Sequence, residues 1–224
     1  MTRKLIDVSH EIEAGMTTYP GLPAPAISDH LSREAARGVY SEGTTFQIGR
    51  IEMVSNTGTY VDAPFHRFAD GKDLASLPLE RLADLIGVVV DVTKRESRAI
   101  DVAQLSQVLG GVILKNCAVL IRTGWDIYWR TPQYGQNAPF LTRAGAEYLL
   151  AAEVALVGID SVNIDDMGDG ERPAHTVLLG AGIPIAEHLC NLNQLPLSEF
   201  RFHAVPVRFR GVGTFPVRAY AVIE

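Results

Sequence analysis

The stretch Ser55-Asn-Thr-Gly-Thr-Tyr-Val-Asp-Ala-Pro-Phe-His66 is the part of this sequence that decides its fold. It combines Asn, Tyr, Asp and His with Gly58 and Pro64. Because a central strand rarely carries polar and ionisable residues beside Pro and Gly, the composition is untypical of a buried strand. If the chain leaves a strand and turns at Gly58, the side chains of Asn56, Tyr60 and Asp62 can converge on one point. The stretch therefore favours a small-molecule or metal site over a core strand.

This stretch resembles the motif His-x-Gly-Thr-His-x-Asp-x-Pro-x-His of the cyclase superfamily, the metal-dependent hydrolases that include bacterial kynurenine formamidases and isatin hydrolases. The matching residues are Gly58, Thr59, Asp62, Pro64 and His66. Asn56 and Tyr60 stand where the motif has histidines. Further similarity lies in segments 7–10, 19–21, 119–125, 158–161 and 174–187. The resemblance covers most of the chain and implies one domain, residues 1–224, with a swivelling β/β/α fold and a partly barrel-like mixed sheet.

The resemblance also implies a metal site. In the family, residues matching Asp62, His175 and Glu187 form one of two adjacent metal positions, and the two motif histidines hold the other with the Asp. We therefore expect one divalent ion per chain, held by these three residues. Zinc and manganese suit such carboxylate and imidazole ligands. From the residues alone, the alternative is a buried polar network in which Asp62 and His175 form hydrogen bonds.

His66 is the predicted general acid or base, because an imidazole exchanges protons near neutral pH. The alternative is a histidine bonded to a backbone carbonyl. Tyr60 is the second predicted catalytic residue, as a phenol that donates to a developing oxyanion, and a pocket-lining aromatic is the alternative. Asn56, Phe65 and Trp125 are predicted to contact the substrate.

Structural or surface roles are expected for His10, His30, His188 and His203. His30 and His203 have no motif context, and His188 would point away from its neighbour Glu187 if that stretch is extended. Both cysteines, Cys117 and Cys190, lie in apolar sequence and are expected to be buried free thiols.

Composition limits the partners. The 224 residues carry a net charge of −6 and have a pI near 5.5, which argues against nucleic acid. No long apolar span is present, so we expect a cytoplasmic protein with no membrane partner. The resemblance implies a homodimer or homotetramer. The aromatic stretch 125–134 is a candidate contact surface, with core packing or covering of the pocket as alternatives.

Hydrophobic periodicity predicts an α/β protein. Buried strands are expected at 87–92, 118–123 and 156–159, and helices at 101–109 and 142–151, capped by Asp101 and Thr142. Further strands are expected at 5–8, 45–54, 183–185, 202–209 and 219–222, a short helix at 79–85, and a helical turn at 173–179.

The leading hypothesis is a hydrolase that attacks the C–N bond of a small amide, such as an aryl formamide or a cyclic amide. One alternative is a metal-free cyclase, dehydratase or lactone-opening enzyme that uses Tyr60, Asp62 and His66. The other is a binding protein without activity. The sequence contains no Gly-x-Ser-x-Gly elbow, so a serine hydrolase is not expected. It also contains no complete nucleotide-binding fingerprint.

Overall fold

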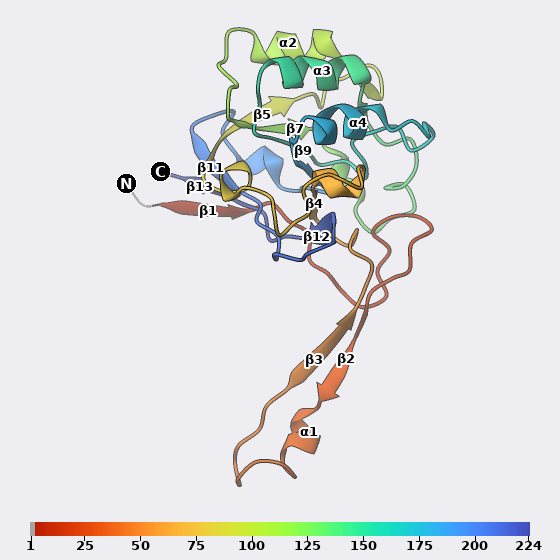
Figure 1. Cartoon of the computed structure of the whole chain (residues 1–224), viewed down its shortest axis with the longest axis vertical. Coiled ribbons are helices and arrows are strands. Elements are labelled where there is room, and N and C mark those ends of the chain that lie inside the picture. The colour runs from red at the N-terminus through yellow and green to blue at the C-terminus, as the bar shows by residue number, and fades with distance from the viewer. Residues whose placement is uncertain (1–2) are drawn as a thin grey trace.

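The computed structural model describes residues 3–224, and a nine-stranded mixed sheet lies at its centre (Figure 1). The strand order is β1-β13-β11-β5-β7-β9-β10-β4-β12, in which β5, β7, β9 and β10 run parallel. The strands are β1 (Lys4–Asp7), β4 (Tyr60–Asp62), β5 (Leu85–Asp91), β7 (Ala118–Arg122), β9 (Leu156–Ile159), β10 (Ile185–Glu187), β11 (Phe200–His203), β12 (Thr214–Pro216) and β13 (Tyr220–Ile223). The sheet is curled into a half-barrel, which confirms the predicted α/β class and the partly barrel-like mixed sheet.

Three helices cover one face of this sheet: α2 (Val102–Leu109), α3 (Arg143–Ala151) and α4 (Pro173–Gly180) (Figure 1). Successive residues of a strand point to opposite faces. Val88 and Val90 therefore pack in one core cluster with residues of these helices, whereas Val89 packs in a second cluster on the other face. Because both faces are covered, the central strands are β-branched runs without polar alternation, as the sequence predicts.

Both predicted helix caps are present. The carboxylate of Asp101 accepts hydrogen bonds from the backbone N–H groups of Ala103 and Gln104, and the Gln104 side chain accepts one from the N–H of Asp101. Thr142 accepts a hydrogen bond from the N–H of Gly145. Each cap satisfies a helix N–H group that has no partner within the helix, and is typically worth about 1 kcal/mol.

An arm projects from the body of the molecule (Figure 1). It consists of β2 (Ala26–Leu31), α1 (Arg33–Ala36) and β3 (Ile48–Glu52), and β2 pairs only with β3. The strand predicted at 45–54 is thus shorter. It is also exposed along its whole length, with Ile51 63% exposed. The alternation of apolar residues predicted that one face of this strand is apolar, but it carried no information on whether another segment covers that face.

Other boundaries also differ from the predictions. The helix expected at 79–85 is a 3-10 turn, η2 (Leu79–Arg81), because β5 already begins at Leu85. The strand expected at 202–209 ends at His203, and Pro206 beyond it has no N–H to donate to a neighbouring strand. The expected turn at 173–179 is the full helix α4. The strand expected at 183–185 is β10, which begins at Ile185. Not predicted were β2, α1, β4, β12 and the two-stranded sheet of β6 (Ala99–Ile100) and β8 (Phe140–Leu141).

Three further 3-10 turns complete the fold: η1 (Pro64–His66), η3 (Trp125–Tyr128) and η4 (Leu192–Gln194). Cys117 and Cys190 are buried free thiols, as predicted. Within residues 3–224, no helix has the length and apolar character needed to cross a membrane.

Candidate functional site

The pairing of β4 with its two neighbours assembles the site. Tyr60 and Asp62 are two residues apart on β4, so their side chains point to the same face. The register places Glu187 of β10 opposite Tyr60, and Thr214 of β12 opposite Asp62. Gly58 precedes β4 with φ 68°, a left-handed conformation that suits glycine, and this is the predicted turn.

A cavity of about 420 Å³ opens above these strands. Its lining residues are Tyr19, Pro20, Gly21, Leu22, Asn56, Tyr60, His66, Arg67, Asn163, Arg172, His175 and Glu187. The structure therefore brings the predicted residues Asn56, Tyr60, His66, His175 and Glu187 to one cavity. Asp62 has no exposed surface and contacts the same group of side chains.

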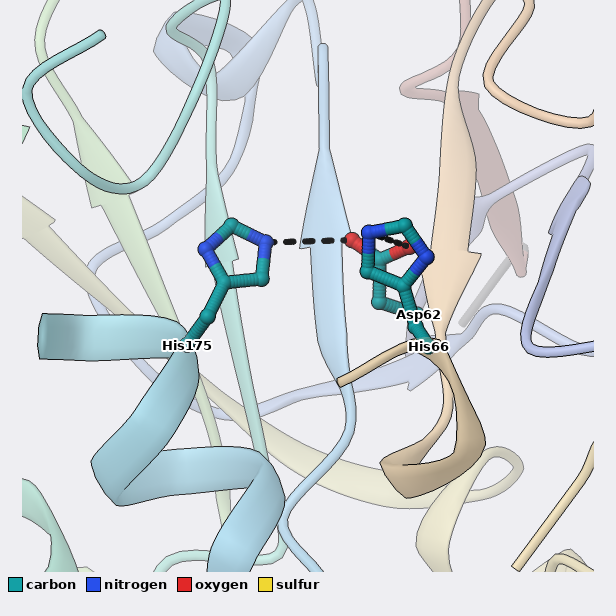
Figure 2. A group of neighbouring side chains, drawn as sticks. All are labelled: Asp62, His66 and His175. Carbon is teal, nitrogen blue, oxygen red and sulfur yellow. Dashed lines mark ion pairs between the residues drawn. The ribbon is translucent and has the colours of Figure 1, made fainter. Parts of the chain in front are cut away.

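The donor atoms around Asp62 fit a metal ion. Oδ2 of Asp62 is buried and has no hydrogen-bond partner in the described part of the chain. Nε2 of His175 lies 3.6 Å from this oxygen, and Nε2 of His66 lies 3.9 Å from Oδ1 (Figure 2). Each of these three residues offers a ligand atom within 4.8 Å of the others. A buried carboxylate oxygen normally has a partner, and a cation held by these three residues would provide one for Oδ2.

Glu187 lies beside this group. Its Oε1 is 3.8 Å from Nε2 of His175 and accepts a hydrogen bond from the N–H of Ile164 at 2.6 Å. Thus Asp62, His175 and Glu187, predicted as ligands, are neighbours. His66 lies as close to Asp62 and His175 as a ligand would, although the sequence predicted only a proton-transfer role for it.

Asp165 orients His175, a role that no sequence motif indicated. Its Oδ2 lies 2.6 Å from Nδ1 of His175, which leaves Nε2 of the ring facing Asp62. The same carboxylate accepts hydrogen bonds from the backbone N–H groups of Ala174 and His175, at 2.6 and 3.1 Å. It therefore caps α4 as well, since Arg172 at the N-cap position provides no side-chain cap. A carboxylate on the far nitrogen of a ligating histidine fixes its tautomer.

The charges of this cluster shift its pKa values. Burial lowers the pKa of His175, but Asp165, Asp62 and Glu187 outweigh burial and raise it to about 10. Burial raises the pKa of Glu187 to about 7, against the opposing charge of His175. Burial also raises the pKa of Asp62, but His175, His66 and Thr214 outweigh burial and lower it overall.

These shifts predict that ion binding depends on pH. A ligand must release its proton before it binds a metal, so ion and proton compete for His175 throughout the range below its pKa of about 10. Raising the pH removes the competitor, and the apparent affinity for Zn²⁺ should increase about tenfold per pH unit for each displaced proton. Below about pH 7 the raised pKa of Glu187 should make this dependence steeper. Competition with a chelating dye at a series of pH values measures the effect, and an affinity that does not change with pH would contradict it.

Thr214 connects Asp62 to His66. Its hydroxyl donates a short hydrogen bond to Oδ1 of Asp62 and lies 2.8 Å from Nδ1 of His66. A hydroxyl has one proton, and a carboxylate only accepts, so Nδ1 of His66 must be the donor to Thr214. Neutral His66 therefore carries its lone pair on Nε2. Gly213 permits this contact, because a Cβ there would lie 2.4 Å from the backbone nitrogen of His66.

Tyr60 belongs to a buried chain of hydrogen bonds. Its hydroxyl is 2.7 Å from Oε2 of Glu187 and 3.3 Å from Nε2 of His188, whose Nδ1 is 2.9 Å from the hydroxyl of Tyr134. Burial, with the charges of Glu187 and Asp62, raises the pKa of Tyr60 well above its ordinary value, so the phenol keeps its proton. That proton is donated to Glu187. The geometry therefore supports Tyr60 as the residue that orients Glu187, and the predicted oxyanion role would require this bond to break.

His188 is fully buried, so the surface alternative considered for it is wrong and the structural one holds. Burial lowers its pKa to about 3, which keeps the ring neutral between two phenols. The sequence did not reveal this contact, because His188 is adjacent to Glu187 and consecutive strand residues were expected to point apart. His188 has φ 56° and lies just beyond β10, so the strand alternation does not apply to it.

Two predicted substrate contacts lie away from the cavity. Phe65 sits in the 3-10 turn η1, where successive side chains point in different directions. Of the three residues of this turn, His66 alone lines the cavity. Trp125 donates its indole N–H to the carbonyl oxygen of Tyr134 and packs in an internal aromatic cluster with Tyr128 and Trp129. The aromatic stretch thus packs largely on itself, which weakens the prediction that it is a contact surface.

Comparison with known proteins places this chain in a family. A family model described as putative cyclase matches residues 6–166. The chain belongs to the cyclase family. A kynurenine formamidase from Bacillus cytotoxicus is 29% identical over 215 residues, which are 96% of this chain and 95% of that cyclase-family protein. A kynurenine formamidase from Geobacillus thermodenitrificans is 28% identical, with 98% and 97% of the two chains covered.

Solved structures share the fold of this chain. Isatin hydrolase A from Labrenzia aggregata has a TM-score of 0.84 at 22% identity, and the match covers 99% of this chain and 94% of that one. The predicted family is thus confirmed. The match to the kynurenine formamidases covers nearly the whole chain, and these relatives are hydrolases. The prediction of a hydrolytic enzyme is therefore also confirmed.

Proposed function

We propose that this cyclase-family enzyme hydrolyses the C–N bond of a small amide, an aryl formamide or a cyclic amide, with the help of one divalent ion. The observation that carries the proposal is the unpaired, buried Oδ2 of Asp62, which lies 3.6 Å from Nε2 of His175 in the side-chain group that lines the cavity. The kynurenine formamidase relatives support an amide as the substrate.

Asp62, His175 and Glu187 would hold the ion. When bound, such an ion lowers the pKa of water and polarises a carbonyl. His66 would be the general acid–base group. Its Nδ1 donates to Thr214, so its Nε2 is free to accept a proton from the attacking water and to return it to the leaving nitrogen. Asn56 lines the cavity and offers an amide to the substrate.

A substrate panel tests this proposal. The purified enzyme would be assayed with N-formylkynurenine, isatin and an aryl lactone, in the presence of Zn²⁺ or Mn²⁺ and after chelation. We expect turnover of an amide that chelation abolishes and added metal restores. Turnover that persists after complete removal of metal would contradict the proposal and support the metal-free cyclase or lactonase. Binding without turnover would support a binding protein.

We predict one ion per wild-type chain, and more after restoration of the family motif. The Asn56→His, Tyr60→His double variant replaces poor ligands by imidazoles next to Asp62, so the metal content should rise towards two per chain. Elemental analysis of both proteins measures this, with Asn56→Gln, Tyr60→Phe as the control. Two ions in the wild type, or no gain in a folded double variant, would contradict the prediction. The control variant also lacks the Tyr60 hydroxyl that bonds Glu187, so its metal content shows what the loss of that bond alone does to the wild-type ion.

We also propose that the enzyme is a homodimer or homotetramer. The support in the structure is the arm, where Ile27, Phe46 and Ile51 are exposed and no other part of residues 3–224 covers them. Light scattering at micromolar concentration should give at least twice the chain mass of 24.4 kDa. The Ile51→Lys variant should shift the protein towards the monomer. A wild-type mass near 24.4 kDa would contradict the proposal.

A further inference from the structure

Two arginines line the same cavity as the candidate metal site. Arg67 follows His66 directly, and Arg172 precedes α4, which carries His175. Some arginines elsewhere on the protein pair with carboxylates, such as Arg98 with Asp166 at 2.9 Å. Others, such as Arg81 and Arg95, donate only to backbone carbonyl oxygens of the described residues. Within residues 3–224, neither cavity arginine has a carboxylate oxygen within 4.0 Å of its guanidinium. Neither of these arginines therefore has an ion-pair partner in the described chain.

The contacts of Arg67 leave its outer nitrogens available. Its Nε donates to Oγ1 of Thr176 at 3.3 Å, and the guanidinium carbon lies 5.4 Å from the centre of the Phe68 ring. These contacts orient the group, and in the described chain neither Nη atom has a hydrogen-bond acceptor. Two parallel N–H groups of this kind match the two oxygens of a carboxylate.

Arg172 is held by neutral acceptors. Nη1 donates to the carbonyl oxygen of Asp166 at 3.1 Å, and Nη2 donates to the hydroxyl of Tyr19 at 3.3 Å and to the carbonyl oxygen of Met167 at 3.5 Å. These bonds fix the guanidinium without removing its charge. Tyr19 lines the cavity too, so a hydroxyl lies beside the cation.

The cavity offers little to a positively charged group. The one carboxylate among its lining residues is Glu187, and both oxygens of Glu187 already accept hydrogen bonds, from Tyr60 and from the N–H of Ile164. Asn56 and Asn163 are neutral. In the proposed function Glu187 holds the ion, so an ammonium group on a ligand would find no unengaged carboxylate among the lining residues and would lie near two guanidinium groups, which is unfavourable.

We propose that the substrate carries a carboxylate, bound by Arg67 and Arg172, and has no ammonium group beside it. This inference rests on the proposed amide hydrolysis at Asp62 and His175, and it narrows the substrate to carboxylated aryl formamides or cyclic amides. The carboxylate is a group that does not react, so its binding energy orients the amide towards His66.

The test compares isosteric substrates on the metal-loaded enzyme. N-formyl-3-aminobenzoate and N-formyl-3-aminobenzamide differ in charge but hardly in shape. We expect kcat/KM to be at least about tenfold higher for the carboxylate, as a charge-assisted bidentate contact supplies. N-formylkynurenine, which carries an ammonium group, should be a poorer substrate than the benzoate. In Arg67→Gln and Arg172→Gln the preference for the benzoate should fall towards one, mainly through KM. Arg50→Gln, on the exposed arm, is the matched control and should change nothing.

Equal kcat/KM values for the two isosteres, or a preference that survives in both arginine variants, would overturn the inference while leaving amide hydrolysis intact. If none of the amides is hydrolysed, the proposed function fails instead. Calorimetric titration of 3-aminobenzoate and 3-aminobenzamide then decides the inference separately, because it needs no turnover. Binding of the benzoate that weakens about tenfold in Arg67→Gln supports the inference. The same affinity in both proteins, or no binding, overturns it.

Discussion

His66→Ala is expected to lower kcat by roughly two to four orders of magnitude, the usual contribution of a positioned acid–base group. The reason is the hydrogen-bond order of the site. Thr214 gives its single proton to Asp62 and accepts from Nδ1 of His66, so the basic Nε2 of His66 is available at the cavity. Alanine removes this proton carrier. Folding should change little, because the His66 side chain is 35% exposed and belongs to none of the hydrophobic core clusters.

Metal content must be measured in the same variant, since His66 lies as close to Asp62 and His175 as a ligand would. Unchanged metal with a reduced rate identifies His66 as the acid–base group. Loss of metal would make it a ligand, and full activity would remove it from the mechanism. His30→Ala, in β2 of the exposed arm, is the matched control and should retain the wild-type rate and metal content.

Asp62→Asn is expected to have the larger effect on the ion. The substitution keeps the shape of the side chain but removes the charge whose unpaired Oδ2 lies next to His175. His175 has a raised pKa partly because of Asp62, so the variant leaves a buried cationic ring with one anionic neighbour fewer. Bound ion should be lost at micromolar concentrations. The rate should fall at least about a thousandfold, since the ion contributes several kcal/mol to the transition state and each 1.36 kcal/mol is tenfold.

Elemental analysis and kinetics on one preparation measure both effects, and thermal unfolding checks that the variant is folded. Asp73→Asn serves as the control, because Asp73 does not line the cavity and, within residues 3–224, its carboxylate accepts hydrogen bonds only from Ser76 and Gly211. If Asp62→Asn retained its ion and its rate, Asp62 would be no more than a member of a buried polar network, which is the alternative that the residues alone left open.

The two variants also separate binding of the ion from proton transfer. A rate that falls in His66→Ala with metal retained, together with a rate that falls in Asp62→Asn with metal lost, is the pattern that metal-assisted hydrolysis requires. Equal metal loss in both variants would instead favour Asp62, His66 and His175 as the ligands. Glu187 would then be the hydrogen-bond acceptor of Tyr60 and not a ligand.

The sequence alone determined the elements whose stability is local or depends on simple burial. The β-branched runs at 87–92, 118–123 and 156–159 became central strands, because their side chains are apolar on both faces. Asp101 and Thr142 became helix caps, because a cap bonds only to the next few residues. The resemblance identified the residues of the motif, and the structure brings Asp62, His175 and Glu187 together.

Only the tertiary structure decided which side chains support them. Thr214 meets Asp62 across 152 residues of sequence, and His188 meets Tyr60 across 128, and both contacts follow from how distant segments align in space. Asp165 reaches His175 because a loop packs against the start of α4. The arm was also beyond the sequence, since apolar periodicity marks a face but not what covers it. Short segments of sequence determine local propensity and the hydrophobic pattern. The register of the strands, and the side-chain contacts that it creates, exist only once the strands have paired.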